Sequence, residues 1–181
     1  MLEKVGNCSN IIDWNEVIKE IAEQRPAYIG PSHKKGDPIP GLKEVTDMWS
    51  RSGFKTVADG GTVEWDMFLP HINFNIAIAE KFCEFVGLKK YTSCWISRIN
   101  PARCSPWHWD VHDDEVNLSQ RTDIVRYHCH IGQPAHGHVL IVDDFCLYKQ
   151  PQGEIYKWPS RTTWHCGLNS GLTPKYLFNI W

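Results

Sequence analysis

The stretch Pro106-Trp107-His108-Trp109-Asp110 decides the expected fold, together with Trp164-His165-Cys166-Gly167 much later in the chain. On an extended strand, residues two apart point to the same face, so the imidazole of His108 and the carboxylate of Asp110 face one space. The two tryptophans that flank His108 would then point to the opposite face and pack behind the strand. The chain between His108 and His165 is long enough to form further strands and to bring His165 back beside His108. Two imidazoles and one carboxylate on one side of a metal form a facial triad, which suits Fe(II) in oxygen-activating enzymes.

The chain after Tyr91 has the pattern of a β fold. Short β-branched and aromatic segments alternate with turn residues, and each of them predicts a strand. The expected strands cover residues 92–99, 124–132, 138–142, 146–149, 154–158, 162–166 and 175–180. Short strands that follow two helical segments predict a mostly β (α+β) chain. The expected architecture is an antiparallel double-sheet jelly roll, the class that includes cupin-type barrels, with the N-terminal helices packed outside the sheet.

Residues 1–90 are expected to hold helices and long loops. A helix is predicted over 13–25, with Asp13 as its N-cap and an apolar stripe at helical spacing. A second helix is predicted over 71–86, with Gly87 as its C-cap.

Residues 27–69 lie between these helices and are rich in glycine and proline. A short helix is expected near 46–52, and the remainder has the composition of long loops. Loops of this length in a compact domain are usually functional, although an irregular scaffold is the alternative. We expect the substrate to enter over this segment, with Trp49, Trp65 and the acidic turn Asp113-Asp114-Glu115 as candidate walls of its site.

The composition indicates one ordinary folded domain. A chain of 181 residues, 42% apolar and 22% charged, fits a single domain over 1–181 with its jelly-roll core over 91–181. The net charge of −2 argues against a nucleic-acid surface. We expect no membrane span, because no apolar run is long enough, and no signal peptide. Seven cysteines without a CxxC pair favour reduced thiols and a cytoplasmic location.

Three further features support a metal site with an anion beside it. Lys175 begins the last strand and, by alternation, faces the interior, where a cation needs an anionic partner such as a metal-bound dicarboxylate. Arg126, His128 and His130 share one face of another strand, which is unusual unless that face meets water or an anion. Ser97 lies on an earlier strand and could donate a hydrogen bond to the same anion. The alternatives are a surface lysine near the C-terminus and a polar outer face of the sheet.

Four motifs then occur in a particular order. They are Arg98-Ile99-Asn100-Pro101, His108-Trp109-Asp110, Arg126-Tyr127-His128 followed by Ile131-Gly132, and His165-Cys166-Gly167-Leu168-Asn169-Ser170 with Lys175. In this order they resemble the aspartyl/asparaginyl β-hydroxylase branch of the Fe(II)- and 2-oxoglutarate-dependent oxygenases. The resemblance covers residues 91–181 and implies a double-stranded β-helix fold with Fe(II), 2-oxoglutarate and O2 as cofactor and cosubstrates.

The resemblance also implies roles for single residues. The implied Fe(II) ligands are His108, Asp110 and His165. The implied 2-oxoglutarate contacts are Ser97, Arg126, His128 and Lys175. Of these, Ser97 and Lys175 would anchor the 5-carboxylate, and the other two would hold the metal-binding end. The chain departs from the family in three ways: Lys175 stands where members usually have Arg, Asp110 is an acidic ligand that some members of this branch lack, and the segment after Asp110 is longer.

We therefore expect a hydroxylase that acts on an unactivated C–H of a small-molecule or peptide substrate, such as a peptidyl or free amino acid or another small polar molecule. Two alternatives stay open. One is a cupin-type isomerase or dioxygenase that does not use 2-oxoglutarate and takes His128 as a third histidine ligand. The other is a non-enzymatic ligand-binding jelly roll with structural histidines. A zinc hydrolase is disfavoured because no HExxH helix occurs.

Overall fold

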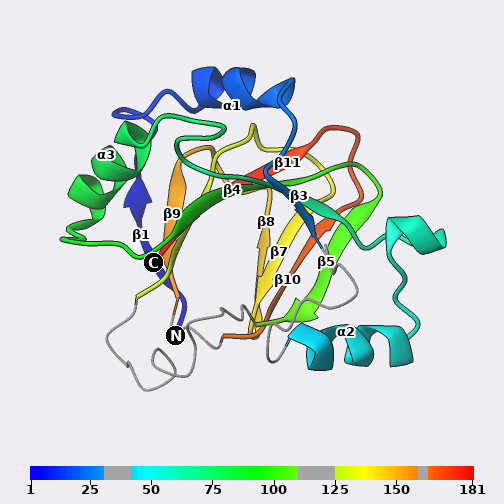
Figure 1. Ribbon diagram of the computed structural model, residues 1–181. Coiled ribbons are helices and arrows are strands. Elements are labelled where there is room, and N and C mark those ends of the chain that lie inside the picture. The colour runs from blue at the N-terminus through cyan, green and yellow to red at the C-terminus, as the bar shows by residue number, and fades with distance from the viewer. Residues whose placement is uncertain (31–41, 110–124, 159–162) are drawn as a thin grey trace.

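Two antiparallel sheets face each other and enclose the interior of the molecule (Figure 1). The computed structural model describes residues 1–30, 42–109, 125–158 and 163–181. In order across the sheet, the larger one contains β1 (Glu3–Asn7), β9 (Glu154–Lys157), β6 (Tyr127–His130), β11 (Lys175–Ile180), β4 (Cys94–Ile99), β3 (Trp65–Phe68) and β2 (Tyr28–Gly30). The smaller one contains β5 (Arg103–His108), β10 (His165–Asn169), β7 (His138–Val142) and β8 (Phe145–Tyr148). This arrangement confirms the mostly β jelly-roll fold expected from the sequence.

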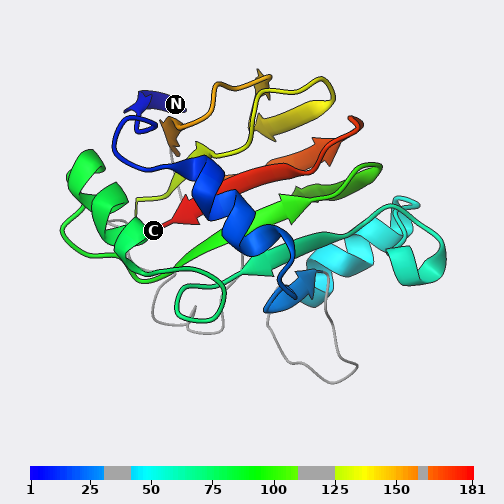
Figure 2. The ribbon, with the colours of Figure 1, turned by 90° about the horizontal axis from the view of Figure 1, so that it is seen from above.

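Two helices cover the outer face of the larger sheet. Figure 2 shows α1 (Trp14–Ala22) lying across it, and α3 (Ala77–Val86) packs beside α1. Their buried side chains Trp14 and Phe82 contact Phe178 of β11, with ring centroids 5.6 and 5.0 Å apart. The helices therefore lie outside the sheet, as expected. None of the described helices is long and apolar enough to cross a membrane.

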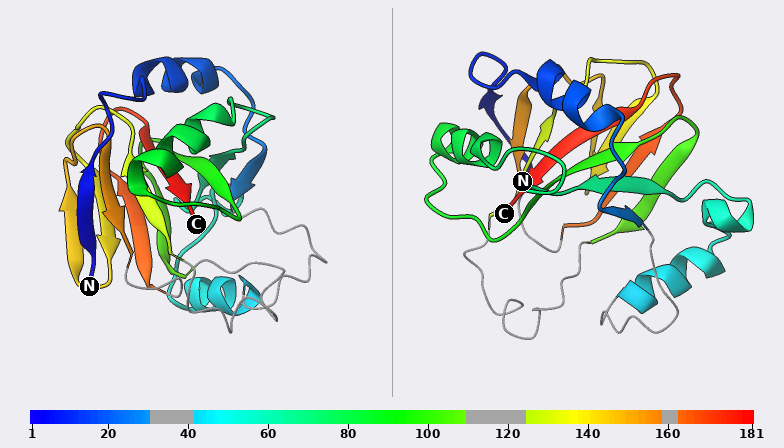
Figure 3. Two further views of the ribbon diagram at one scale, coloured as in Figure 1. Left: turned by 90° about the vertical axis from the view of Figure 1, so that its left-hand side faces the viewer. Right: turned by 45° about the horizontal axis from the view of Figure 1, so that its top comes forward.

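The remaining helical segments lie at the other end of the molecule. These are α2 (Leu42–Arg51), which is the short helix expected near 46–52, and a single 3-10 turn at Val57–Asp59. Figure 3 shows α2 on the opposite side of the sheets from α1. From this position Trp49 of α2 donates a hydrogen bond through Nε1 to the carbonyl oxygen of Trp107, at 2.6 Å. That bond ties α2 to β5.

The last strand divides the interior from the helical side. Phe178 and Ile180 of β11 belong to the apolar core under the helices and are fully buried. Leu177 and Asn179 point the other way, toward the space between the sheets. The alternation predicted for residues 175–180 is therefore correct, and it sets which side chains can reach the interior.

The N-terminal part contributes more to the sheet than we expected. The strands β1, β2 and β3 all come from residues 1–90, for which only helices and loops were predicted. The sequence of β1, EKVGN, is polar and mostly exposed, so it carries no apolar alternation. Its pairing with β9 depends on the partner strand, which the local sequence does not encode.

The helix predicted over 71–86 begins late, at Ala77. The side chain of Asn73 accepts a hydrogen bond from the Leu69 amide at 3.1 Å and donates one to the carbonyl oxygen of Arg25 at 3.0 Å. Such side-chain bonds to the backbone compete with helix formation and favour a turn. The end of the helix is as predicted, because Gly87 adopts a left-handed conformation with φ of 70°.

Candidate active site

The two predicted histidine ligands meet inside the barrel. His108 ends β5 and His165 begins β10, and they are direct partners in the antiparallel register, with ring centroids 4.1 Å apart. The Nδ1 atom of His108 lies 2.6 Å from the carbonyl oxygen of Pro106, and that of His165 lies 3.0 Å from the carbonyl oxygen of Thr163. An imidazole that donates from Nδ1 to a carbonyl presents Nε2 to a metal, as metal-binding histidines commonly do.

The surroundings of both imidazoles favour their neutral form. Burial, with a smaller effect of the positive charge of Arg126, lowers the pKa of His108 to about 4. Burial also lowers the pKa of His165, with the neighbouring His108 as the next cause. A neutral imidazole is the form that binds a metal, so both side chains are ready to act as ligands near neutral pH.

The third predicted ligand, Asp110, lies outside the described residues, as do Asp113, Asp114 and Glu115. Within the described ranges, no group of three His, Cys, Asp or Glu side chains could hold a metal ion. The structure therefore brings together two of the three predicted ligands, on neighbouring strands of the smaller sheet.

A bulge in β5 sets the direction of His108. His165 pairs with His108, but two residues later Gly167 pairs with Ser105, so β5 holds one extra residue. As a result, Ser105 and His108 both line the interior although they are three positions apart. Pro106 lies within the bulge, where its missing N–H leaves no ladder bond unmade. Bulges of this kind often re-aim a side chain beside a functional site.

The two tryptophans beside His108 lie in different surroundings. We expected Trp107 and Trp109 to pack together behind the strand, and for Trp109 this is wrong. Trp109 lines the interior cavity and packs edge-on against Trp164, with ring centroids 4.5 Å apart. Trp107 lies outside the cavity lining and is 39% exposed. Strict alternation does not extend to Trp109, because β5 ends at His108.

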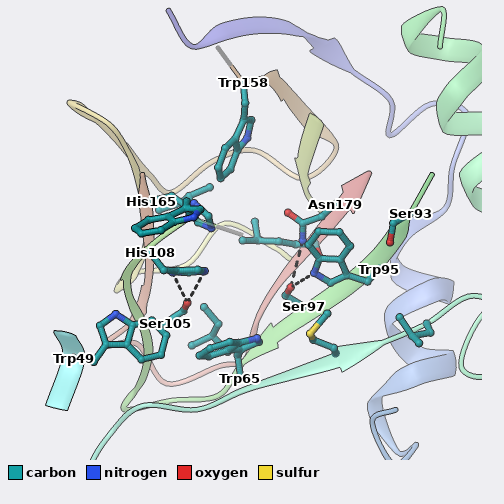
Figure 4. A pocket seen from close by; sticks show the side chains of 17 residues that line it. Trp49, Trp65, Ser93, Trp95, Ser97, Ser105, His108, Trp158, His165 and Asn179 are labelled. Atoms are coloured by element: carbon teal, nitrogen blue, oxygen red, sulfur yellow. Dashed lines mark hydrogen bonds between the residues drawn. The ribbon is translucent and has the colours of Figure 1, made fainter. Parts of the chain in front are cut away.

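A cavity of about 220 Å³ opens beside the two imidazoles (Figure 4). Trp49 and Trp65 lie together on one side of the imidazoles, and Trp158 lies on the other side. The polar side chains of the lining are Ser93, Ser97, Ser105, His108, His165 and Asn179. The lining contains no Asp, Glu, Lys or Arg among the residues that the structure describes. The two tryptophans expected as walls are thus at the cavity.

Ser97 reaches the cavity from β4, next to Asn179 of β11. Asn179 donates from Nδ2 to Ser97 Oγ at 3.3 Å and accepts at Oδ1 from Nη2 of Arg126 at 3.3 Å. The indole of Trp95 also donates to Ser97 Oγ, at 3.0 Å. With two donors on its oxygen, the Ser97 hydroxyl can direct its own proton to an acceptor in the cavity. Sequence reasoning missed Asn179 as a site residue, although alternation put it on the same face as Lys175.

Arg126 lies behind the cavity wall instead of in its lining. It is 3% exposed, so a polar outer face is the wrong description of its strand. Its guanidinium lies 3.9 Å from the ring centroid of Trp158 and within 5.5 Å of those of Trp95 and Trp181. Burial lowers the pKa of Arg126 to about 9, so the group still carries its charge at neutral pH. The Asn179 amide connects this charge to the cavity.

His128 also lies behind the wall, fully buried. Its Nδ1 accepts a hydrogen bond from the indole N–H of Trp158, and its Nε2 lies 3.4 Å from Nε2 of Gln150. The ring stacks on Tyr156, with the centroids 5.4 Å apart. Burial lowers its pKa well below the usual value, so this imidazole is neutral. Its Nδ1 is thus engaged by the indole of Trp158, and its Nε2 faces the side-chain amide of Gln150.

Lys175 is buried behind the cavity lining, next to Gly167, with 1% of its surface exposed. Its Nζ donates to the carbonyl oxygen of Val139, and no carboxylate of the described chain pairs with it. A Cβ atom at Gly167, which lines the cavity, would lie 3.8 Å from this Nζ. The ammonium therefore lies directly behind a gap left by a glycine. Its ionisable neighbours include the buried imidazoles of His130 and His138, whose pKa values its charge helps to lower.

Comparisons with known proteins find a similar fold at low sequence identity. No protein-family model and no curated protein sequence matches the chain. An oxidoreductase of the 2OG-Fe(II) oxygenase family from Burkholderia pseudomallei is 11% identical, with a TM-score of 0.46, over 94% of this chain and 91% of that one. A prolyl-4-hydroxylase from Pseudomonas putida is 12% identical, with a TM-score of 0.44, over 94% and 98%.

A cupin-type structure is also among the similar ones. A predicted oxalate decarboxylase from Thermotoga maritima is 10% identical, with a TM-score of 0.40, over 65% of this chain and 78% of that one. With TM-scores below 0.5 and such low identities, these similarities assign no activity to the chain. The function has to be argued from its own residues.

Proposed function

We propose that the chain is an Fe(II)- and 2-oxoglutarate-dependent oxygenase that hydroxylates a C–H bond of a small molecule or of an amino acid, free or within a peptide. The observation that carries the proposal is Lys175, a fully buried cation that no carboxylate of the described chain pairs with. Burying its ammonium costs several kcal/mol, roughly, and the lowered pKa of about 7 reflects this cost, so a lysine at this place favours an anionic ligand that restores its charge. That ligand would lie next to a pair of metal-type imidazoles.

The donor set fits Fe(II). His108 and His165 supply two neutral imidazoles whose Nδ1 atoms are oriented by backbone carbonyls. Asp110 follows two residues after His108 and would supply the carboxylate. Two histidines and one carboxylate leave positions open on the metal, and this set is typical of non-haem Fe(II) sites that activate O2. When bound, Fe(II) with 2-oxoglutarate supplies the oxidising chemistry; the protein residues bind, orient and exclude water.

The anion contacts fit a dicarboxylate. Lys175 behind Gly167 and the hydroxyl of Ser97 would bind the 5-carboxylate. Arg126 acts through Asn179, whose amide holds Ser97 in place. We assign His128 a positioning role, because its hydrogen bond with Trp158 orients an indole of the cavity wall. These assignments keep the roles implied by the sequence, except that His128 and Arg126 act from behind the wall.

The hydrogen bond between Trp158 and His128 weighs against the cupin alternative. In that alternative His128 would be a third metal ligand and 2-oxoglutarate would not bind. Metal ligation by His128 would require one ring nitrogen to leave Trp158 or Gln150, and a buried indole N–H without a partner is costly. Lys175 would also keep a buried charge without a ligand to balance it.

The test is an anaerobic titration of the Fe(II)-loaded protein with 2-oxoglutarate, followed by the visible charge-transfer absorption of the chelate. We expect the band in the wild type, no band in Asp110→Ala, and a loss of 2-oxoglutarate affinity of at least about tenfold in Lys175→Met. Lys19→Met is the matched control, because the Lys19 side chain is exposed on α1. An absent band in the wild type with Fe(II) still bound would reject the proposal and favour the cupin alternative.

A further inference from the structure

The cavity contains two walls of different character. Trp95 and Trp158 belong to the wall around Arg126, where their rings already face its guanidinium. Trp49, Trp65 and Trp109 form the opposite wall, which we call the tryptophan wall. Two of its rings lie close to each other and to a metal-type imidazole: Trp49 and Trp65 are 6.1 Å apart at their centroids, and each lies within 6.0 Å of the His108 ring.

The tryptophan wall is separate from the main core. Trp49 belongs to a small apolar cluster with Val63 and Cys104, and Trp65 and Trp109 are only partly buried at its edge. Partly buried indoles that line a cavity have apolar surface still available for contact. A ligand that covers this surface gains hydrophobic and aromatic contact that the protein alone does not make.

The indole N–H of Trp49, the most buried tryptophan of the wall, already has a hydrogen-bond partner. Trp49 donates its N–H to the carbonyl oxygen of Trp107 at 2.6 Å, so what it offers to the cavity is its carbon surface. The neighbouring lining adds the side chains of Met67 and Leu69, which are also apolar. This half of the cavity therefore selects for an apolar or aromatic group.

The charges near the cavity decide between a neutral aromatic group and a cation. Aromatic walls can bind either one. The buried cations Arg126 and Lys175 lie behind the lining, and no carboxylate of the described residues lines the cavity. A cationic substrate group would find no counter-charge in the described lining, whereas a neutral ring needs none.

We propose that the tryptophan wall binds a neutral aromatic group of the substrate and holds the carbon next to it beside His108 and His165. This inference rests on the proposed oxygenase function and narrows its substrate class. Trp65 is the main contact, because its ring lies nearly parallel to that of His108, at an interplanar angle of 19°. The substrate is then an aromatic amino acid side chain or a comparable ring-bearing small molecule, instead of a charged polar one.

The test uses two small probes, indole and tetramethylammonium, titrated calorimetrically into the anaerobic protein with Fe(II), with and without 2-oxoglutarate. We expect indole to bind and tetramethylammonium not to bind. Trp65→Ala and Trp109→Ala should each weaken indole binding by about tenfold, and Trp65→Phe, which keeps a ring, by no more than about threefold. Tyr148→Ala is the matched control, because Tyr148 is an exposed aromatic residue of β8 outside the cavity.

The outcomes separate this inference from the proposed function. Tetramethylammonium binding as tight as that of indole, or unchanged indole affinity in both alanine variants, would overturn the tryptophan-wall assignment even if 2-oxoglutarate binds. Conversely, indole binding that depends on Trp65 in a protein that fails to bind 2-oxoglutarate would uphold the wall and reject the oxygenase. Thermal melting of each variant checks that a lost signal does not come from unfolding.

Discussion

Lys175 illustrates how a side chain that is proposed to bind a ligand can lower the stability of the ligand-free fold. Burial lowers its pKa to about 7, because the folded chain removes the ammonium from water. We predict that Lys175→Met raises the free energy of unfolding of the ligand-free protein by about 1–4 kcal/mol, since a well-packed apolar residue often replaces a buried charge with such a gain. Urea unfolding at neutral pH measures this, and Lys19→Met should leave the stability unchanged.

The pH dependence of stability follows from the same side chain. The pKa of Lys175 is about 7 in the folded protein and near 10.5 in the unfolded chain, so the unfolded chain binds more protons between these values. The contribution of Lys175 to stability therefore rises with pH from about 7 to about 10.5. Lys175→Met should reduce this slope. An equal slope in the wild type and the variant, in urea titrations across this range, would contradict the burial of a titrating amine.

Among the strands, those with two buried faces could be predicted well from the sequence. The alternation of Trp95, Ser97 and Ile99 correctly places all three along the cavity. The short, polar strand β1 was missed because its pairing partner lies about 150 residues away. The bulge in β5 was missed as well, because a one-residue register shift leaves no periodic pattern. The position of Trp109 was missed because β5 ends at His108, so strand alternation does not extend to this residue.

Residue type alone also hid the most informative side chains. A lysine near the end of the chain is usually exposed; alternation pointed Lys175 inward, and the position of β11 within the larger sheet buries it. Gly167 gives no chemical signal at all in the sequence. Its importance becomes visible only where β10 crosses Ile99 and the Lys175 ammonium. The candidate histidines, in contrast, could be found from the sequence. Metal ligands come from a few residue types, and the spacing of His108 and Asp110 puts two of them on one face of a strand.

β10 carries both His165 and the glycine that keeps the cavity open. A Cβ atom at Gly167 would lie 2.7 Å from Cδ1 of Ile99, which is buried in β4. We predict that Gly167→Ala lowers the free energy of unfolding by about 1–3 kcal/mol through this overlap. Ile99→Val removes the overlapping methyl group and alone should cost about 0.5–1.5 kcal/mol.

The double variant Gly167→Ala/Ile99→Val tests the contact directly. If the overlap is the cause, the double variant should be more stable than the sum of the two single effects predicts. Chemical denaturation of the four proteins completes the cycle, with Gly53→Ala as a comparison because a Cβ there meets nothing within 4 Å, although its positive φ of 83° adds a separate backbone cost. Strictly additive effects would mean that Ile99 is not what limits the space at Gly167.

The molecule as a whole divides the proposed site between its two sheets. His108 and His165 belong to the smaller sheet, whereas Ser97, Asn179 and Lys175 belong to the larger one. A metal would thus be held by one sheet, and the far carboxylate of a dicarboxylate by the other. A ligand that binds both the metal and the cations would connect the two sheets, so the two binding events should be thermodynamically coupled.

We predict that 2-oxoglutarate binds the Fe(II)-loaded protein at least about tenfold more tightly than the metal-free protein, and that His165→Ala removes this difference. Anaerobic calorimetry measures both affinities. Succinate is the control ligand, because it keeps a carboxylate for Lys175 but lacks the 2-oxo group beside a carboxylate that chelates a metal; its affinity should change little with Fe(II). Equal metal dependence for the two ligands would mean that the metal acts only by stabilising the smaller sheet. In that case the cations of the larger sheet would bind the anion alone, and the two halves of the site would not work together.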